Sequence, residues 1–356
     1  MGVLDICIDA WNFELTNLAS KQPQPIVIIS HRPNGAAFRY RIQPLVELLT
    51  EKGLPCTVIP LVKKNYGLRF LAYKKLIEQA PFVLLHKVRM PRLEAAFLFS
   101  LNRHFYFDID DAIYMQQPKY VGHVRRPSWV RKRNFEYMAQ QCRTVIVGNE
   151  FLAKKVIEAK GKPQQAPTGI DVQNYQARAL DANSFRAVWV GMPANIRYLD
   201  AIRPALVKVA EQEPRFKLVV ISSEFPDWDD VPIEKVVWSL NGEKAEIARA
   251  DMGLMPLAHD EYSEAKCAFK LLQYMAAGIA CIGSPVGANC DVVEQGQSGF
   301  LADSLEQWRD SILTLLNDEG LRQAMGQRGR ELAEEHYDTR KIAQNTLAFL
   351  EEDSKR

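Results

Sequence analysis

Residues 266–299 decide the fold, and they begin with Lys266-Cys267-Ala268-Phe269-Lys270-Leu271-Leu272-Gln273-Tyr274-Met275-Ala276-Ala277-Gly278. Within this run, Leu271, Leu272 and Met275 are spaced at i, i+1 and i+4. This spacing predicts a short helix that turns one apolar side toward a core. Lysines stand at the start of that helix, at positions 266 and 270.

The rest of the segment predicts a strand and a turn. Gly278 is suited to end the helix, because glycine readily adopts the left-handed conformation found just after a helix. The apolar run 279–283 predicts a buried strand, and the glycines within 295–299 predict a turn. The order helix, strand and turn is typical of an α/β protein.

The start of the predicted helix is suited to bind a diphosphate. The first N–H groups of a helix have no partner within it, and the helix dipole makes that end positive. Residues 268–271 would present these groups, and Lys266 and Lys270 add positive charge. A structural interpretation stays open, because every α/β protein has helices that begin after loops.

The same segment resembles the donor-binding segment of glycosyltransferase family 4, whose members are retaining enzymes with the GT-B fold. The resemblance covers roughly residues 26–350. The stretches that carry it, besides 266–302, are Arg39–Arg41, Phe107–Ala112, Pro167–Asp171, Trp189–Leu199, Ser304–Trp308 and Leu321–Arg330.

The resemblance implies the architecture. It implies an α/β protein with two Rossmann-like, doubly wound parallel-sheet domains that face each other across a cleft. Residues 1–167 would form the acceptor-binding domain and 168–338 the nucleotide-sugar-binding domain, with the helix 339–356 packing back on the first domain. Short apolar runs that alternate with amphipathic segments predict two such halves independently. One of these segments, 40–52, predicts a single helix that ends at Gly53.

The donor site departs from the family pattern at two places. Many members carry two glutamates eight positions apart, and here Ala265 and Gln273 stand in their place. Gln273 can still hydrogen-bond a ribose hydroxyl, whereas Ala265 replaces a carboxylate. Either Glu264 or Glu261 would then reach the sugar, or this branch handles it differently.

The usual arginine after Gly191 is also missing, because Met192 stands there. Arg197 and Lys266 are our candidates for neutralising the leaving diphosphate, although Arg197 is equally expected as an ordinary helix residue. The predicted donor-binding residues are Gly191, Trp238, Glu264, Ala268, Phe269, Lys270, Leu271 and Gln273.

Acidic residues after a predicted strand form the candidate catalytic group of the first domain. Alternation along the strand places Asp108 and Asp110 on one side, where a carboxylate could orient or deprotonate a hydroxyl. Capping of the next helix and metal binding are the alternatives. The predicted acceptor-binding residues are Gly35, Arg39, Arg41 and His86. If the segment around Arg39 and Arg41 is helical, both cannot face the cleft.

Charge is distributed unevenly along the 356 residues, although the net charge is only +2. Residues 1–180 carry 26 Lys and Arg against 14 Asp and Glu, while 181–356 carry 19 against 29. Basic clusters near Trp129 would suit an anionic membrane surface, and ordinary solvated faces are the alternative. No nucleic-acid-binding motif accompanies the charge, so no nucleic-acid partner is expected.

The remaining features suit a cytoplasmic protein, with association at the inner face of the membrane as a further expectation. There is no apolar run of 18 residues, no basic start of a signal peptide, and no Cys-x-x-Cys pair. The six histidines form no i, i+4 pair. No cofactor is expected beyond the co-substrate, and we expect the reaction to be metal-independent.

The resemblance implies a glycosyltransferase that moves a hexose from a nucleotide diphosphate sugar to an acceptor hydroxyl with retention. The acceptor would be a glycan, a lipid-linked molecule or a small molecule. Two alternatives stay open: a nucleotide-sugar-binding partner protein without catalysis, and a nucleotide-sugar epimerase of the same fold.

Overall fold

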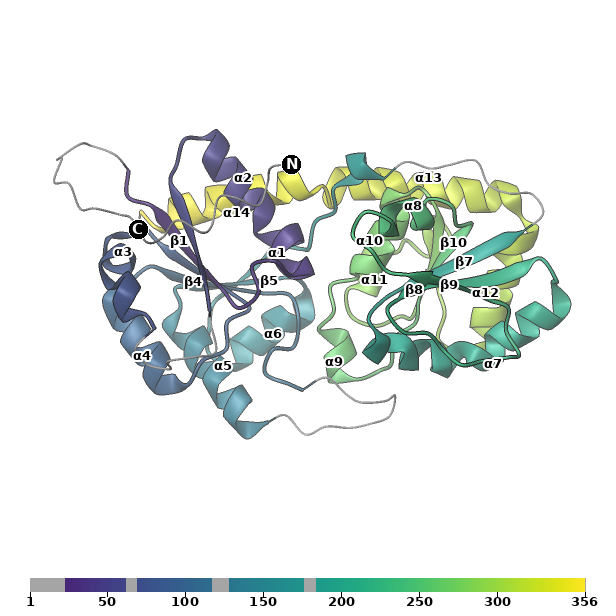
Figure 1. The fold of residues 1–356 in the computed structure, drawn as a ribbon, viewed down its shortest axis with the longest axis horizontal. Coiled ribbons are helices and arrows are strands. Elements are labelled where there is room, and N and C mark those ends of the chain that lie inside the picture. Colours follow the sequence, from purple (N-terminus) through teal and green to yellow (C-terminus); the bar gives the residue numbers. More distant parts are fainter. Residues whose placement is uncertain (1–22, 62–68, 117–127, 176–183, 356) are drawn as a thin grey trace.

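The computed structural model describes residues 23–61, 69–116, 128–175 and 184–355. These residues form two six-stranded sheets in which every strand pair is parallel. Figure 1 shows the two sheets side by side, each covered by helices. The predicted pair of doubly wound halves is therefore confirmed.

The first sheet has the strand order β2-β1-β3-β4-β5-β6. Its strands are β1 (Ile26–Ser30), β2 (Cys56–Pro60), β3 (Val83–His86), β4 (Phe105–Ile109), β5 (Thr144–Val147) and β6 (Pro163–Gln165). The helices of this half are α1 (Ala36–Arg41), α2 (Gln43–Glu51), α3 (Lys74–Gln79), α4 (Arg92–Leu101), α5 (Trp129–Gln141) and α6 (Glu150–Glu158). Strands β1, β3, β4 and β5 are buried along their whole length, as expected when helices cover both faces.

The single helix predicted over 40–52 is wrong, because the structure divides this segment between α1 and α2. Ile42 lies between the two helices, and Pro44 stands in the first turn of α2. Proline has no N–H, and its ring clashes with the carbonyl of the residue four positions earlier, so α1 cannot continue through it.

The second sheet has the strand order β12-β11-β10-β7-β8-β9. Its strands are β7 (Phe185–Val190), β8 (Phe216–Ser222), β9 (Ile233–Val237), β10 (Met252–Met255), β11 (Ala280–Gly283) and β12 (Gly299–Leu301). The helices are α7 (Ile196–Gln212), α8 (Glu243–Ile247), α9 (Glu261–Glu264), α10 (Phe269–Ala276), α11 (Asn289–Val292), α12 (Leu305–Asn317) and α13 (Glu319–His336).

Helix α14 (Thr339–Asp353) follows α13 and packs on the first sheet. Leu347 and Leu350 lie in the same apolar cluster as Leu45 and Leu49 of α2. The Asp353 carboxylate also accepts a hydrogen bond from Tyr106 of β4, at 2.8 Å. The exact domain limits after residues 167 and 338 stay a prediction.

No helix in the ranges that the structure describes combines the length and the apolar character needed to cross a bilayer.

Candidate functional site

A cleft of about 260 Å³ lies between the two sheets. It is lined from the first half by helix α1 and by the loops that follow β3 and β4, and from the second half by the end of β10 and the start of α10. Ligands of open α/β sheets bind at the carboxyl ends of the strands, and here two such ends contribute to one cleft. The lining residues are Ala36, Ala37, Tyr40, Lys87, Asp110, Asp111, Thr168, Met255, Lys266, Cys267, Ala268, Phe269 and Lys270.

Helix α10 begins at the cleft without a side-chain cap. Ala268 is the N-cap residue, and its methyl group cannot accept a hydrogen bond. The preceding helix α9 differs, because the Asp260 side chain accepts from the N–H of Ser263 there. The N–H groups at the start of α10 therefore have no acceptor within the helix and lie where Ala268 to Lys270 line the cleft. Ala268 also has a φ of 51°, a conformation that costs of order 1–3 kcal/mol outside glycine and often marks functional sites.

Two lysines flank this helix start. The Lys266 ammonium lies 4.8 Å from the centre of the Tyr262 ring, and that of Lys270 lies 5.7 Å from the Trp189 ring. Burial and, to a smaller extent, the nearby Lys266 lower the pKa of Lys270 to about 7, against the opposing effect of Glu243. An anionic ligand in the cleft would therefore raise the pKa of Lys270 and favour its charged form.

Phe269 connects the two halves at one side of the cleft. Its ring centre lies 4.2 Å from that of Tyr40 on α1. Both residues line the cleft, so the contact forms part of its wall and leaves the space beside the helix start open. Leu271, in the next position, is fully buried in the apolar core of the second half.

Asp110 lies on the opposite wall, paired with a lysine. The Lys87 ammonium is 2.6 Å from the Asp110 carboxylate and 4.0 Å from that of Asp111. Burial opposes ionisation of Asp110, but the positive charges of Lys87 and Arg41 prevail and lower its pKa below the ordinary value. Lys87 itself has a φ of 49°, a left-handed backbone conformation that is unfavourable for a residue other than glycine. The chain adopts this conformation at the residue that places the ammonium group beside Asp110.

Asp108 does not line the cleft. Its carboxylate is buried and lies 2.6 Å from the Arg41 guanidinium and 2.9 Å from Nδ1 of His86. Arg41 also donates to the carbonyl of Ala166 and to the hydroxyl of Thr168, at the start of the connection between the sheets. Burial opposes ionisation, yet the charge of Arg41 keeps the pKa of Asp108 well below its usual range. Asp108, Arg41 and His86 thus form a buried network outside the cleft lining.

Two more predicted acceptor residues also lie outside the cleft lining. Gly35 is the N-cap of α1, with extended backbone. Arg39 donates to the carbonyl of Asn34, and its guanidinium lies 6.0 Å from the centre of the Tyr40 ring. Ala36 and Ala37, which follow Gly35, are the residues of α1 that line the cleft together with Tyr40.

Arg197 is buried at the start of α7. Its guanidinium donates to the carbonyl of Ala194 and to the hydroxyl of Tyr198, and that hydroxyl is 3.0 Å from the hydroxyl of Ser263. Arg197 is not among the residues that line the cleft. Gly191 follows β7 close to the Trp189 ring, where an added Cβ would lie 2.6 Å from a ring carbon.

Gln273 is buried and uses its amide within the protein. Nε2 donates to the hydroxyl of Tyr175, at 3.3 Å, and to the carboxylate of Glu243. The same Glu243 accepts from the indole N–H of Trp238, which is partly exposed after β9. Glu243 therefore joins two predicted donor residues, although nothing in its sequence context had singled it out.

Hydrogen bonds from the first half hold the loop between α9 and α10. Asn149 donates from Nδ2 to the carbonyls of Glu264, at 3.1 Å, and Lys266, at 3.0 Å. Its Oδ1 meanwhile caps α6 by accepting from the N–H of Leu152. The Cys267 thiol donates to the carbonyl of Asp110, at 3.3 Å.

Sequence reasoning missed several residues of this site: Tyr40, Lys87, Asn149, Thr168, Tyr175 and Glu243. Only Asn149 carried a usable signal, since an asparagine that follows a buried strand and precedes a glutamate is typical of a helix N-cap. In the described part of the chain, no three His, Cys, Asp or Glu side chains could share a metal ion. The metal-independent reaction stays a prediction.

The second half of the chain matches a known family. Residues 185–318, which contain β7 to β12, match the family model described as glycosyl transferases group 1. The match lies entirely within the second half of the chain.

Two curated relatives match short segments. N-acetyl-alpha-D-glucosaminyl L-malate synthase of Bacillus anthracis is 38% identical over 74 residues, which are 20% of this chain and 19% of the relative. Spore coat protein SA of Bacillus subtilis (strain 168) is 32% identical over 80 residues, which are 22% of this chain and 21% of the relative. The aligned segments thus span about a fifth of each of these relatives.

Solved structures match almost the whole chain. Sucrose-phosphate synthase from Thermosynechococcus elongatus has a TM-score of 0.69 at 16% identity, with 92% of this chain and 98% of that chain covered. HepE of Anabaena, in complex with UDP and glucose, has a TM-score of 0.66 at 14% identity, with 92% and 99% covered. At such low identity these matches establish the fold, which is GT-B.

Proposed function

We propose that this protein is a retaining glycosyltransferase that transfers a sugar from a nucleoside diphosphate sugar to an acceptor hydroxyl. The observation that carries the proposal is the uncapped start of α10, with Lys266 and Lys270 beside it, opening into a cleft whose other wall holds Asp110. The match of the second domain to group 1 glycosyltransferases supports it. HepE, which was solved with UDP and with UDP-glucose, makes a UDP-sugar the first donor to test.

The leaving diphosphate would be stabilised at the start of α10. As the bond between the sugar and the phosphate breaks, negative charge grows on the diphosphate, and fixed N–H groups and cations aimed at it lower the barrier. Lys266 and Lys270 supply the cations, and each charge-assisted hydrogen bond contributes about 1.5–3 kcal/mol. Arg197 is not assigned this role, because its guanidinium is bonded to Ala194 and Tyr198.

The acceptor hydroxyl would approach from the wall that carries Asp110 and Lys87. The ionised Asp110 carboxylate can orient the hydroxyl and accept its proton, and Lys87 fixes the position of that carboxylate. Delivery of the hydroxyl to the same face that the diphosphate leaves gives retention without a protein nucleophile. Cys267 fits this, because burial and the negative charge of Asp110 raise the pKa of its thiol to about 12, so it stays protonated and unreactive.

Binding and turnover test the proposal separately. A thermal-shift panel of UDP, GDP, ADP and dTDP should show stabilisation by one of them, about 2.7 kcal/mol at 100 times its dissociation constant. Lys266→Ala should weaken binding of the diphosphate about ten- to hundredfold and leave the nucleoside unaffected. Lys217→Ala is the matched control, since Lys217 is an exposed lysine on β8 in the same domain. Absence of any nucleotide binding would end the proposal.

A second candidate function rests on Ala265. This residue is fully buried, and the neighbouring glutamates lie elsewhere: Glu261 accepts from Tyr114 at 3.3 Å and pairs with Lys155 at 3.2 Å. Neither Glu261 nor Glu264 lines the cleft. A nucleotide-sugar-binding protein without transferase activity would bind donor and never consume it. An epimerase would convert donor without acceptor, so donor consumption that requires an acceptor excludes both.

We also propose a cytoplasmic location with attachment to an anionic membrane surface. At the start of α5, Trp129 is 67% exposed and Val130 59% exposed, and the Arg133 guanidinium lies 4.4 Å from the Trp129 ring. An exposed aromatic residue beside basic residues suits the boundary of an anionic bilayer. Co-sedimentation with phosphatidylglycerol vesicles that is lost in Trp129→Ala would support attachment at this helix, and equal sedimentation with neutral vesicles would contradict it.

A further inference from the structure

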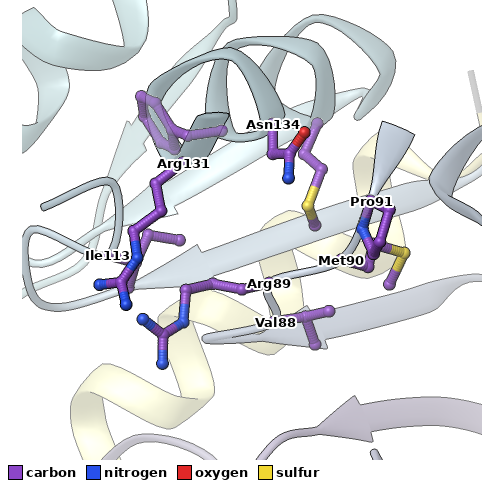
Figure 2. A pocket seen from close by; sticks show the side chains of 9 residues that line it. Val88, Arg89, Met90, Pro91, Ile113, Arg131 and Asn134 are labelled. Carbon is purple, nitrogen blue, oxygen red and sulfur yellow. The ribbon is translucent and has the colours of Figure 1, made fainter. Parts of the chain in front are cut away.

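A second cavity lies in the first half, close to the cleft. Its volume is about 320 Å³, and it is formed by the segment after β3, the segment after β4 and one face of α5. We call it the arginine pocket, because Arg89 and Arg131 line it (Figure 2). Much of its remaining lining is apolar: Val88, Met90, Ile113, Phe135 and Met138.

The arginine pocket and the cleft share two loops. After β3, Lys87 lines the cleft and the next residue, Val88, lines the pocket. After β4, Asp111 lines the cleft and Ile113 lines the pocket. Because neighbouring Cα atoms are about 3.8 Å apart along the chain, the pocket and the cleft lie beside each other at these two loops.

The positive charges of the pocket are not balanced within the described residues. Among these residues, the Arg89 guanidinium makes no hydrogen bond or ion pair, while Arg131 donates to the carbonyl of Met115 at 2.8 Å. Arg89 is exposed at the edge of the pocket, and partial burial together with repulsion from Arg131 and Arg32 lowers its pKa, against the attraction of Asp111. An anion that bridges two guanidinium groups offsets the repulsion between them. The planar guanidinium group also binds phosphate and carboxylate especially well.

The two guanidinium groups lie at one end of the pocket (Figure 2). In Figure 2 the guanidinium groups of Arg89 and Arg131 extend to the same side, beside Ile113, whereas Met90 and Pro91 lie at the other side. Asp111 of the cleft acts on Arg89 electrostatically, so the arginine end is the one near the cleft.

We propose that the arginine pocket binds the acceptor, and that the acceptor is an amphiphile with a phosphate or carboxylate between its reacting hydroxyl and an apolar body. The hydroxyl lies at Lys87 and Asp110, the anion at Arg89 and Arg131, and the apolar body against Met90. This assignment rests on the proposed glycosyltransferase function. A neutral sugar acceptor would leave both the arginines and the apolar wall unused.

Calorimetry with three probes tests the pocket without requiring turnover. Hexyl phosphate carries both features, hexanol lacks the anion, and inorganic phosphate lacks the apolar body. Hexyl phosphate should bind at least about tenfold more tightly than either of the others. Arg89→Gln should weaken its binding about ten- to hundredfold. The control is Lys75→Gln, which removes an exposed charge on α3 of the same half and should change binding less than about twofold.

An experiment with lipid vesicles distinguishes an acceptor anion carried by a membrane lipid from one carried by a soluble molecule. Phosphatidylcholine vesicles with and without phosphatidic acid are compared for wild type, Arg89→Gln and Lys75→Gln. Binding that requires both phosphatidic acid and Arg89 supports a lipid-borne acceptor, and Arg89-dependent binding of hexyl phosphate alone supports a soluble one.

Arg89-independent binding in both experiments, equal binding of inorganic and hexyl phosphate, or no binding of any probe or vesicle overturns the proposal. Binding of the nucleoside diphosphate to Arg89→Gln is measured in parallel. Since the donor site is in the other half, that affinity should be unchanged, and this distinguishes failure of the pocket from failure of the proposed function.

Discussion

The lowered pKa of Lys270 predicts that the protein takes up a proton at this side chain when it binds the donor. Its pKa in the free protein is about 7, compared with an ordinary value of 10.5, because of burial and the nearby Lys266. A diphosphate bound at the start of α10 would raise that pKa again, since an opposite charge favours the ammonium form. Binding should therefore be coupled to protonation of this side chain.

The sign and size of the effect follow from linkage. Below about pH 6 Lys270 is almost fully charged in both states, so affinity is highest there and changes little. Between pH 7 and the higher pKa that Lys270 has in the complex, Lys270 is mostly neutral in the free protein and charged in the complex. Binding should then take up about half a proton at pH 7 and about 0.9 at pH 8, and affinity should fall by up to about tenfold per pH unit.

Calorimetry in buffers with different ionisation enthalpies counts the protons directly. The ligand should be a nucleotide sugar, because its pyrophosphate has no group that titrates near neutrality. In Lys270→Arg the guanidinium is always charged, so proton uptake and the pH dependence should vanish. In Lys270→Met the binding should be about ten- to hundredfold weaker at pH 6. Lys217→Arg, on an exposed face of the same domain, should behave as wild type.

Two results would refute this reasoning. Uptake of the same number of protons by Lys270→Arg would mean that another group titrates. Equal affinity of Lys270→Met and wild type at pH 6 would mean that the ammonium does not contact the diphosphate.

Substitutions at three further sites, with a control at a fourth, test other parts of the structure. Asn149→Ser keeps an oxygen that can cap α6 but removes the two hydrogen bonds that Asn149 donates to the second half, so the free energy of unfolding in urea should fall by about 1–3 kcal/mol. Asn149→Ala also removes the cap, so its free energy of unfolding should be lower by about 1 kcal/mol more. Asp110→Asn should lower kcat about a hundredfold or more while donor affinity measured by calorimetry is unchanged. Gly326→Ala would place a Cβ 2.1 Å from the carbonyl of Gly278 and should lower the thermal stability by about 1–3 kcal/mol, whereas Gly320→Ala, with 3.5 Å to its nearest neighbour, should not.

Local patterns in the sequence were sufficient to predict helix α10 and strand β11. The helix predicted from Leu271, Leu272 and Met275 is α10, and the apolar run after Gly278 contains β11. These features depend on residues within a few positions of each other. Apolar periodicity does not predict the division of 40–52 into α1 and α2, because it continues across Pro44 and is insensitive to the missing N–H of that proline.

The partners of the acidic residues could not be predicted in the same way. Alternation placed Asp108 and Asp110 on one side of a strand, yet Asp108 contacts Arg41 and His86 while Asp110 contacts Lys87. Those partners follow or belong to other strands, and their approach depends on strand order and on the left-handed backbone of Lys87. Neither the order nor that conformation is encoded in spacing along the chain.

Interdomain contacts give the anion site its geometry, and this has a thermodynamic consequence. Asn149 and Tyr40 of the first half contact Lys266 and Phe269, which are residues at the start of α10. Separation of the two halves would break these contacts and release the loop that carries Lys266. A ligand that binds the start of α10 only when this loop is in place must therefore also favour the closed arrangement, by the same free energy with which closure favours the ligand. Asn149→Ser should accordingly weaken donor binding even though Asn149 does not line the cleft, and the loss should be larger for a complete nucleotide sugar than for the free nucleoside.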